Sequence, residues 1–398
     1  MMRAALTGWL PVVAGLGMGT AMAGAPVPPP AAAAPGPAGF APAVTPRSFL
    51  FPRDHGPHES FRQEWWYLTG NLDGAGGQRL GFELTFFRFA LQPPAAAAEP
   101  AAQSAWRTRQ IYMAHFAITD VAAQRFSFAQ KLSREALGLA GAQGEPLRVW
   151  IDDWSLQGAM ANAATIRADG SWSVHAAQEG YQLELTLQAL TAPVLNGEAG
   201  LSRKSSVPAD ASYYYSIPRL AARGVLTRDG RALPVQGLAW FDREWGSAQL
   251  NARQAGWDWF ALQLQDGSAL MFYALRARGG GRDPHSAGTW LETSGQTRLL
   301  RDPQVDVEVL DHWKSVRGTV YPSGWRIRVP SLALELSVRP VLADQELTGT
   351  PAYWEGAVDV AGTRAGQKLG GRGYVELVGY AAERSPPGAT GAPARLGR

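Results

Sequence analysis

The stretch WWYLTGNLDG at residues 65–74 returns in altered form as WDWFALQLQDG at residues 257–267. Each copy opens on aromatic residues, contains strand-forming side chains and ends in Asp-Gly, which is typical of a tight turn between antiparallel strands. Each copy is also followed by an aromatic segment that ends in arginine, FFR at 86–88 and YALR at 273–276. The two stretches therefore predict equivalent first strands in two copies of one unit.

Two further segments recur in the same order. A glycine and a tryptophan at 170–172 precede LEL at 183–185, and Gly324-Trp325 precedes LEL at 334–336. GLAWFD at 237–242 is matched by GRGYVE at 371–376, so that Glu376 stands where the first copy has Asp242. Three ordered matches indicate an internal repeat. We place the first copy at residues 48–246 and the second at 247–382.

The periodicity between residues 48 and 382 is that of strands. Apolar and polar residues alternate at 82–86, 181–187 and 332–338. The best candidate for a short helix is residues 133–139. An up-and-down barrel removes exposed strand edges by closure and can hold one small ligand inside. The sequence thus predicts an all-β fold of two tandem lipocalin-like antiparallel β-barrels, with a pair of packed β-sandwiches as the alternative.

Composition limits the classes of function. The chain of 398 residues is 46% hydrophobic and has 15 Trp, which is enough for large cores. Its formal charge of +3 is spread without a block of Lys or Arg, so nucleic acid is not the expected partner. It has no Cys, which rules out disulfides and a lipid-modified N-terminal cysteine.

The two ends of the chain have compositions of their own. Residues 1–23 combine Arg3, a short apolar run broken by Pro11 and the small-residue site Ala21-Met22-Ala23. This pattern predicts a cleaved signal peptide, and hence a secreted or periplasmic protein, better than it predicts a membrane-spanning anchor. Residues 24–47 are an Ala/Pro-rich linker, 92–102 a hairpin insertion and 383–398 a disordered tail.

Acidic residues end the last strand of the first copy. Strand alternation places Asp242 and Glu244 on one face, with Arg243 and Trp245 on the other. A carboxyl group that faces an apolar space has a raised pKa and can protonate a C=C bond, so both residues are candidate catalytic acids. The second copy has Val378 and Gly379 in place of Glu244 and Trp245, which favours chemistry in the first copy. Alternatively, these charges pair with Arg53, Arg62 or Arg88 and are purely structural.

Aromatic side chains are the candidate walls of an apolar ligand site. Their rings could stabilise a carbocation, although packing in the core is the plainer explanation for any single ring. The candidate ligand-binding residues are Trp65, Trp66, Tyr67, His115, Tyr214, Trp245, Trp257 and Trp259. No metal and no cofactor is predicted, because His55 and His58 lie in a Pro/Gly loop without a zinc signature. Arg203 and Lys204 are candidates for an anionic head group.

Six segments together resemble the AttH/CrtC family: residues 51–56, 64–67, 114–120, 201–204, 212–216 and 240–246. The family includes carotenoid 1,2-hydratases, and the resemblance implies two lipocalin-like domains. Hydratase-like relatives carry His before the Glu-Trp pair, where this chain has Arg243. Because arginine stays protonated, it cannot shuttle protons at neutral pH.

The sequence leaves two classes of function open. In the first, a secreted lipocalin-like protein binds a hydrophobic molecule, isoprenoid or lipid. In the second, a carotenoid 1,2-hydratase-like lyase adds water to a C=C bond by acid catalysis, so whether the protein is an enzyme stays open. The expected partner is a hydrophobic small molecule, and a further protein partner in the cell envelope is left open.

Overall fold

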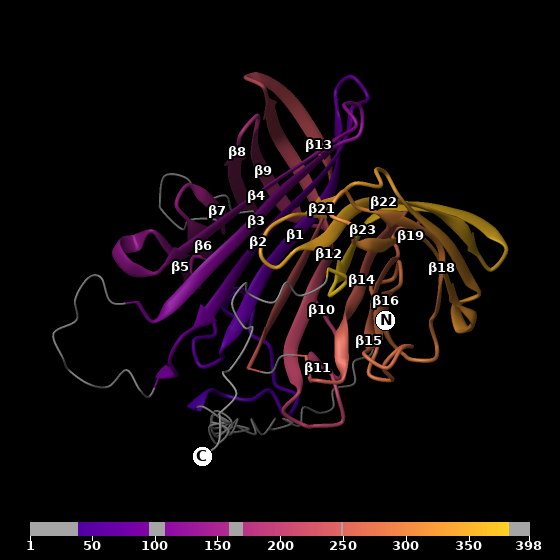
Figure 1. Cartoon of the computed structure of the whole chain (residues 1–398), viewed down its shortest axis with the longest axis horizontal. Coiled ribbons are helices and arrows are strands. Elements are labelled where there is room, and N and C mark those ends of the chain that lie inside the picture. The colour runs from indigo at the N-terminus through magenta and orange to yellow at the C-terminus, as the bar shows by residue number, and fades with distance from the viewer. Residues whose placement is uncertain (1–38, 95–107, 159–169, 248–249, 382–398) are drawn as a thin grey trace, which may run out of the picture. The chain divides into compact units, whose positions relative to one another are not determined.

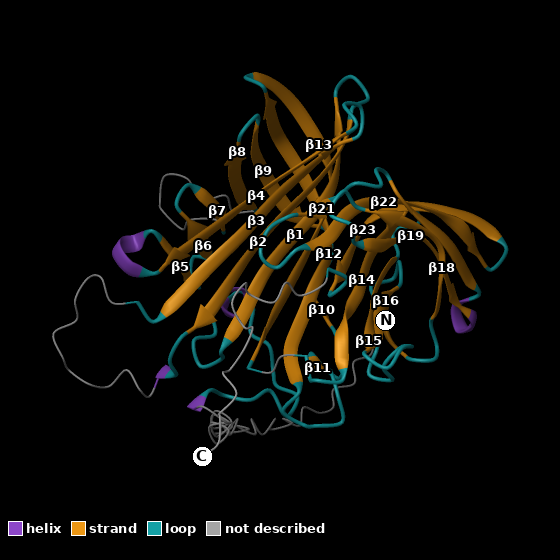
Figure 2. Cartoon of the chain, viewed as in Figure 1, coloured by secondary structure: helices purple, strands orange, loops and turns teal. Residues whose placement is uncertain are grey.

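The computed structural model describes residues 39–94, 108–158, 170–247 and 250–381, which are almost entirely strands and turns (Figure 2). The predicted signal peptide, the tail at 383–398 and most of the hairpin insertion lie outside these residues. The prediction of an all-β fold with two tandem antiparallel, lipocalin-like barrels is confirmed. Each copy of the repeat forms one curled sheet, as Figure 1 shows in indigo to pink and in orange to yellow.

The first sheet is built from long strands at its centre and short strands at one edge. Its pairing order is β4-β3-β2-β1-β13-β12-β9-β8-β7-β6-β5, and β10 and β11 pair with β12. The strands are β1 (Gln63–Gly74), β2 (Arg79–Ala90), β3 (Gln110–Asp120), β4 (Arg125–Arg134), β5 (Ala140–Gln143), β6 (Arg148–Ile151), β7 (Trp154–Gln157), β8 (Trp172–Gln178), β9 (Tyr181–Ala189), β10 (Val194–Leu195), β11 (Leu201–Arg203), β12 (Ala211–Arg228) and β13 (Arg231–Gly246).

The second sheet repeats this plan with fewer strands. Its order is β17-β16-β15-β14-β23-β22-β20-β19-β18, and β21 pairs with β22. The strands are β14 (Gln254–Leu264), β15 (Ala269–Ala277), β16 (Ala287–Leu291), β17 (Thr297–Arg301), β18 (Asp306–Lys314), β19 (Val320–Val329), β20 (Leu334–Pro340), β21 (Glu346–Leu347), β22 (Tyr353–Arg364) and β23 (Gln367–Val378).

The internal repeat is visible in the pairing. In each sheet the last strand returns to pair with the first, β13 with β1 and β23 with β14. Asp242 lies opposite Tyr67, and Glu376 lies opposite Trp259. The match between the two closing strands in the sequence is therefore also a match in position within the sheet.

Side chains complete the first barrel where strand pairing stops. Among the described strands, the ladder ends at β4 and β5 rather than closing through hydrogen bonds. Across this gap, Lys131 Nζ lies 4.9 Å from the ring centre of Trp154, and Gln178 Nε2 donates to the carbonyl of Ser127 at 3.3 Å. The first barrel is thus closed by side-chain contacts instead of by strand pairing among the described strands.

The interior of each barrel is a packed core. Buried residues such as Leu68, Phe116 and Trp154 fill the first, and Phe260 and Trp325 are among those that fill the second. A third cluster of buried residues takes side chains from both sheets. The apolar cavity described below is lined by residues of both sheets instead of by the interior of one barrel.

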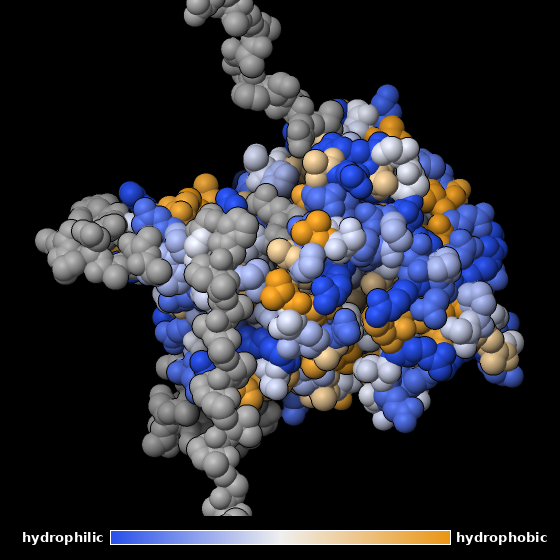
Figure 3. Space-filling view, turned by 90° about the horizontal axis from the view of Figure 1, so that it is seen from below, coloured by the Kyte–Doolittle hydropathy of each residue, from blue (hydrophilic) through white to orange (hydrophobic). Residues whose placement is uncertain are grey.

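The two sheets approach each other closely. A Cβ atom added at Gly81 of β2 would come within 2.6 Å of the Tyr374 hydroxyl and 2.8 Å of the Ala357 Cβ in the second sheet. Asn71 Nδ2 donates to the carbonyl of Gly373 at 3.1 Å. On the outer face in Figure 3, apolar residues are interspersed with polar ones instead of forming one continuous patch.

Two local expectations differ from the structure. The segment proposed as a helix, residues 133–139, begins at the end of β4. The only helical structure in it is a 3-10 turn, η4 (Ala136–Gly138). The end of the proposed linker is packed on the first barrel, because Ala43 is fully buried and the Tyr213 hydroxyl donates to the carbonyl of Thr45. The remaining short helical turns are η2 (Arg53–His55) and η5 (Pro330–Leu332).

Candidate functional site

The end of β13 presents different chemistry on its two faces. Asp242 and Glu244 face the second sheet, whereas Trp245 is fully buried in the core of the first barrel and Arg243 is buried beside it. The adjacent strand β12 divides its tyrosines in the same way: Tyr214 faces outward, and Tyr213 and Tyr215 pack in the core. Alternation of side chains thus separates a structural face from a face toward the second sheet.

A cavity of about 450 Å³ lies between the two sheets. Its volume falls within the range of small-molecule sites. Lys204, Asp242, Glu244 and Glu376 supply its charged groups. Its aromatic lining residues come from both sheets: Trp65, Tyr67, Phe87, Phe89, Tyr214, Trp257, Trp259, Tyr273 and Tyr353. We call this space the inter-sheet cavity.

Asp242 is the most heavily hydrogen-bonded acid of the cavity. Its Oδ1 accepts from Ser216 Oγ at 2.5 Å and from Trp240 Nε1 at 2.7 Å, and its Oδ2 accepts from the Tyr214 hydroxyl. Burial outweighs these donors and raises the pKa of Asp242 to about 7. The carboxyl group can therefore be protonated near neutral pH and give up that proton.

Glu244 is held differently, by a cation. Ser212 Oγ donates to its Oε1, and Lys204 Nζ lies 3.2 Å from the same oxygen. Although burial opposes it, this carboxylate raises the pKa of Lys204. Lys204 is also 4.1 Å from the ring centre of Tyr273. The Glu244–Lys204 ion pair thus adds a polar wall to a largely aromatic cavity.

Glu376 brings a third carboxyl group from the second sheet. Its Oε2 accepts from Trp257 Nε1 at 2.7 Å, and its side chain lines the inter-sheet cavity. Burial, together with the nearby carboxyls of Asp242 and Glu244, raises the pKa of Glu376 to about 7. The residue that corresponds to Asp242 in the repeat therefore lies in the same cavity and is also poised near neutral pH.

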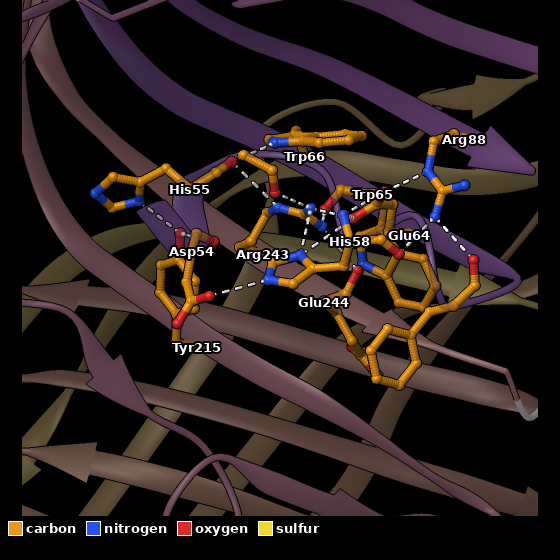
Figure 4. A network of polar contacts seen from close by, with 12 residues as sticks. Asp54, His55, His58, Glu64, Trp65, Trp66, Arg88, Tyr215, Arg243 and Glu244 are labelled. Carbon is orange, nitrogen blue, oxygen red and sulfur yellow. Dashed lines mark hydrogen bonds and ion pairs between the residues drawn. The ribbon is translucent and has the colours of Figure 1, made fainter. Parts of the chain in front are cut away.

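A second polar network lies on the core side of the same strands (Figure 4). The Glu64 carboxylate accepts from Arg88 and Arg243, and the backbone N–H of His58 donates to it at 3.0 Å. Despite complete burial, these cations and His58 hold the pKa of Glu64 well below its usual range. Asp54 Oδ1 lies 3.1 Å from His58 Nε2 and extends the network. These charges are paired and fixed.

This network corrects the structural alternative drawn from sequence. Arg88 pairs with Glu64, and Lys204 is the cation beside Glu244, so Arg88 does not neutralise the acids of β13. No ion pair with Arg53 or Arg62 is found at Asp242 or Glu244 among the described residues. Arg243 points away from the cavity and lies 3.9 Å from the ring centre of Trp66.

The predicted ligand-binding residues divide between the two faces. Trp65, Tyr67, Tyr214, Trp257 and Trp259 line the inter-sheet cavity. The others do not: Trp66 and Trp245 are fully buried in the first core, and His115 is buried with its Nδ1 2.7 Å from the Tyr353 hydroxyl. Trp66 and Trp245 lie on the core face, away from this cavity, because neighbouring residues of a strand face opposite ways.

Sequence reasoning missed several residues of the cavity wall. Phe87 and Phe89 alternate along β2, and Tyr273 lies on the second strand of the second copy. Aligning the two copies strand by strand would have pointed to Phe87 and Tyr273, which follow the two first strands. No sequence pattern points to Tyr353, which reaches the cavity only because the second sheet packs against the first.

Neither a cluster of metal-ligating side chains nor a long apolar helix is found in the described residues. No group of three or more His, Cys, Asp or Glu side chains there is arranged to hold a metal ion. His58 instead stacks on Trp245, with ring centres 3.7 Å apart. No described helix is long and apolar enough to cross a membrane.

Known proteins resemble this chain over most of its length. A crystal structure of an AttH protein from Nitrosomonas europaea is 36% identical, covers 86% of this chain and all of that one, and superimposes with a TM-score of 0.74. Kievitone hydratase from Nectria haematococca shares the fold at 15% identity and a TM-score of 0.62, covering 85% of this chain and 97% of that one.

A curated relative and a family description complete the comparison. The dehydratase asqC of Emericella nidulans is 26% identical over 217 residues, which are 52% of this chain and 60% of that protein. The chain thus matches somewhat less than two thirds of that relative's length. The model of the AttH-like family matches residues 42–380. The resemblance drawn from the six sequence segments is confirmed, and the chain belongs to the AttH-like family.

Proposed function

We propose that the protein is a hydro-lyase that adds water to, or removes it from, a C=C bond of an apolar isoprenoid or lipid-like molecule held in the inter-sheet cavity. The observation that carries this proposal is a buried carboxyl, Asp242, whose pKa is raised to about 7 at the wall of an aromatic cavity. A general acid works best when its pKa is near the operating pH. The names of two relatives, a hydratase and a dehydratase, agree with this class of reaction.

The proposed addition begins with protonation. The π electrons of the double bond form a new C–H bond with the proton of Asp242, which leaves Asp242 as a carboxylate and the substrate as a carbocation. Water then forms the C–O bond and loses a proton to a carboxylate of the cavity. The net change is addition of one water molecule, and the reverse sequence eliminates it.

The surroundings of Asp242 suit both stages. Before transfer, Tyr214, Ser216 and Trp240 orient the carboxyl group, and after transfer the same donors stabilise the carboxylate. The faces of Trp65, Trp257 and Trp259 offer cation–π stabilisation to the intermediate. Arg243 takes no part, because its guanidinium lies in the core network. Arginine at this position therefore does not weigh against hydration.

The test uses geraniol, farnesol and lycopene as probes in heavy-oxygen water. Wild-type protein is expected to convert at least one probe into an alcohol that carries the label, detected by mass spectrometry. Asp242→Asn should lower that rate about 10²–10⁴-fold. Asp258→Asn is the matched control, since Asp258 is a buried aspartate of the second sheet outside the cavity lining.

The outcomes separate catalysis from carriage. Recovery of bound but unlabelled probe from wild type would contradict the lyase and favour a carrier of hydrophobic molecules. Equal loss of activity in both variants would assign the effect of Asp242→Asn to folding. Failure of every probe to bind or react would contradict an apolar ligand altogether.

We also infer that the protein acts outside the cytoplasm, in the periplasm or medium. This proposal rests on the sequence of residues 1–23 alone. N-terminal sequencing of protein recovered from the periplasmic fraction is expected to begin after Ala23. Recovery of the uncleaved chain from the cytosol would contradict it.

A further inference from the structure

We propose that Glu376 is the second catalytic group of the inter-sheet cavity, acting as the base that takes the proton from the attacking water while Asp242 acts as the acid. This inference rests on the hydro-lyase function proposed above and deepens it. In the reverse reaction the roles exchange: Glu376 protonates the departing hydroxyl and Asp242 removes the proton from carbon.

The first support is positional. Asp242 and Glu376 occupy equivalent places on the closing strands of the two sheets, opposite Tyr67 and Trp259 of the two first strands. Because both of these partner residues line the inter-sheet cavity, the repeat brings one carboxyl group from each sheet to it. The sequence suggested that the second copy chiefly supports the first. In this proposal the second copy also contributes a catalytic group.

The second support is the limited hydrogen bonding of Glu376. Asp242 accepts three side-chain hydrogen bonds, but Glu376 accepts one that the structure records, from Trp257 Nε1. Glu376 is half-buried and lines the cavity, so oxygen lone pairs are left for a water molecule there. A carboxylate with spare acceptor capacity on the wall of a cavity is suited to a general base.

The third support is the electrostatic coupling between Asp242 and Glu376. The titratable groups that interact electrostatically with Glu376 include Asp242 and Glu244 from β13, Glu355 and Tyr353 from β22, Glu83 from β2 and Tyr67 from β1. Burial and the neighbouring carboxyls raise the pKa of Glu355 well above its usual range, and burial raises the pKa of Glu83 to about 8. Glu83 is thus mostly neutral at pH 7, burial disfavours the ionised form of Glu355, and Glu244 is paired with Lys204.

Asp242 and Glu376 are the carboxyls of the cavity lining that have no ion-pair partner among the described residues. Each raises the cost of ionising the other, so the state with one proton on the pair is favoured over the fully ionised one. One acid and one base on facing sheets is the combination that hydration needs. Addition transfers a proton from Asp242 to carbon and a proton from water to Glu376. Exchange with solvent then restores the starting state.

The test compares Glu376→Gln with wild type on whichever of the three probes reacts. The variant is expected to lose about 10²–10⁴-fold in kcat and to lose the low-pH limb of the pH–rate profile, because that limb reports ionisation of the base. The high-pH limb, which reports protonated Asp242, should remain. Glu346→Gln is the control, since Glu346 is a buried glutamate of the same sheet that bonds Tyr321 away from the cavity.

Two further variants guard against a trivial loss of structure. Glu376→Asp should retain part of the activity and both limbs, and formate should restore activity to Glu376→Ala by supplying a carboxylate. Unchanged kcat and an unchanged low-pH limb in Glu376→Gln would overturn the inference while leaving the lyase in place. An inactive wild type on all probes would overturn the lyase itself, and this inference with it.

Discussion

The two faces of β13 place carboxyl groups in opposite electrostatic environments. On the core side, Arg243 and Glu64 are buried and joined to each other, and the pKa of Glu64 is held well below its usual range. On the cavity side, Asp242 has neutral hydrogen-bond donors and no ion pair among the described residues, and burial raises its pKa to about 7. A buried carboxyl beside cations has a lowered pKa, and one held by neutral donors alone has a raised pKa.

The same comparison explains why most of the charged sequence motifs are structural. His58, Glu64 and Arg243 belong to motifs that suggest chemistry, yet all three join the core network of Figure 4. Asp242 and Glu376 differ because they face the space between two sheets. The position of a charged residue relative to the cavity therefore sets its environment, and substitutions on the two faces should have different effects.

The largest effect on stability is expected from Arg243→Met. It leaves Glu64 buried with Arg88 as its remaining guanidinium partner, and breaking a buried pair costs about 3–5 kcal/mol. The measurement is urea unfolding followed by circular dichroism. The double variant Glu64→Gln/Arg243→Met should cost less than the sum of the two single variants, because each single variant already breaks the same pair. A double variant as unstable as the sum of the single variants would contradict a direct pairing.

A smaller effect is expected from pH. The folded-state pKa of Asp242 is about 7, above its unfolded value, so the neutral form favours folding. Stability from this group is complete below the unfolded pKa and is lost as pH rises toward 7, by up to about 4 kcal/mol at about 1.4 kcal/mol per pKa unit. Asp242→Asn should flatten the fall of the urea midpoint between pH 5 and 8.

The control for this pH effect is Asp359→Asn, which alters a half-exposed aspartate that pairs with Arg79. Its pH profile should match that of wild type. If Asp242→Asn also followed the wild-type profile, the raised pKa would be contradicted. A residual slope is expected from Glu376 and Glu83, whose pKa values are raised in the same direction.

Replacing the two adjacent tryptophans of β1 tests the two faces directly. Trp66→Phe removes the indole that donates to the carbonyl of His55 at 2.8 Å in the core, and should cost about 1–3 kcal/mol. Trp65→Phe alters the cavity wall and should cost less in stability while weakening retention of farnesol. Unfolding and ligand titration by fluorescence measure the two effects. Equal losses of stability would contradict the division of faces.

The smallest effect is expected at the exposed contacts between the sheets. Arg372 pairs with Asp73 at 2.8 Å, with both side chains well exposed, and such pairs contribute about 0–1 kcal/mol. Asp73→Asn should therefore shift the urea midpoint only slightly, and less in high salt than in low salt. A large shift would show that this surface pair, rather than the buried cluster, holds the sheets together.

The sequence determined the class of fold and the relation between its halves. Strand periodicity predicts the β structure, and the recurrence of the first strands and of the closing strands predicts two equivalent sheets. Alternation also predicts that Asp242 and Glu244 share a face opposite Arg243 and Trp245. These features are local, because they depend on residue spacing along single strands.

Only the tertiary structure decided which face meets a ligand site. Periodicity assigns residues to two faces without saying which one points inward, so Trp65 and Trp66 are indistinguishable in sequence. The cavity arises where two sheets meet, and it joins Asp242 to Glu376, residues that are far apart in the chain. Burial and neighbouring charge set the pKa values, and both depend on long-range packing. The sequence thus supplied the acids, and the packing of one repeat against the other placed two of them in a single cavity.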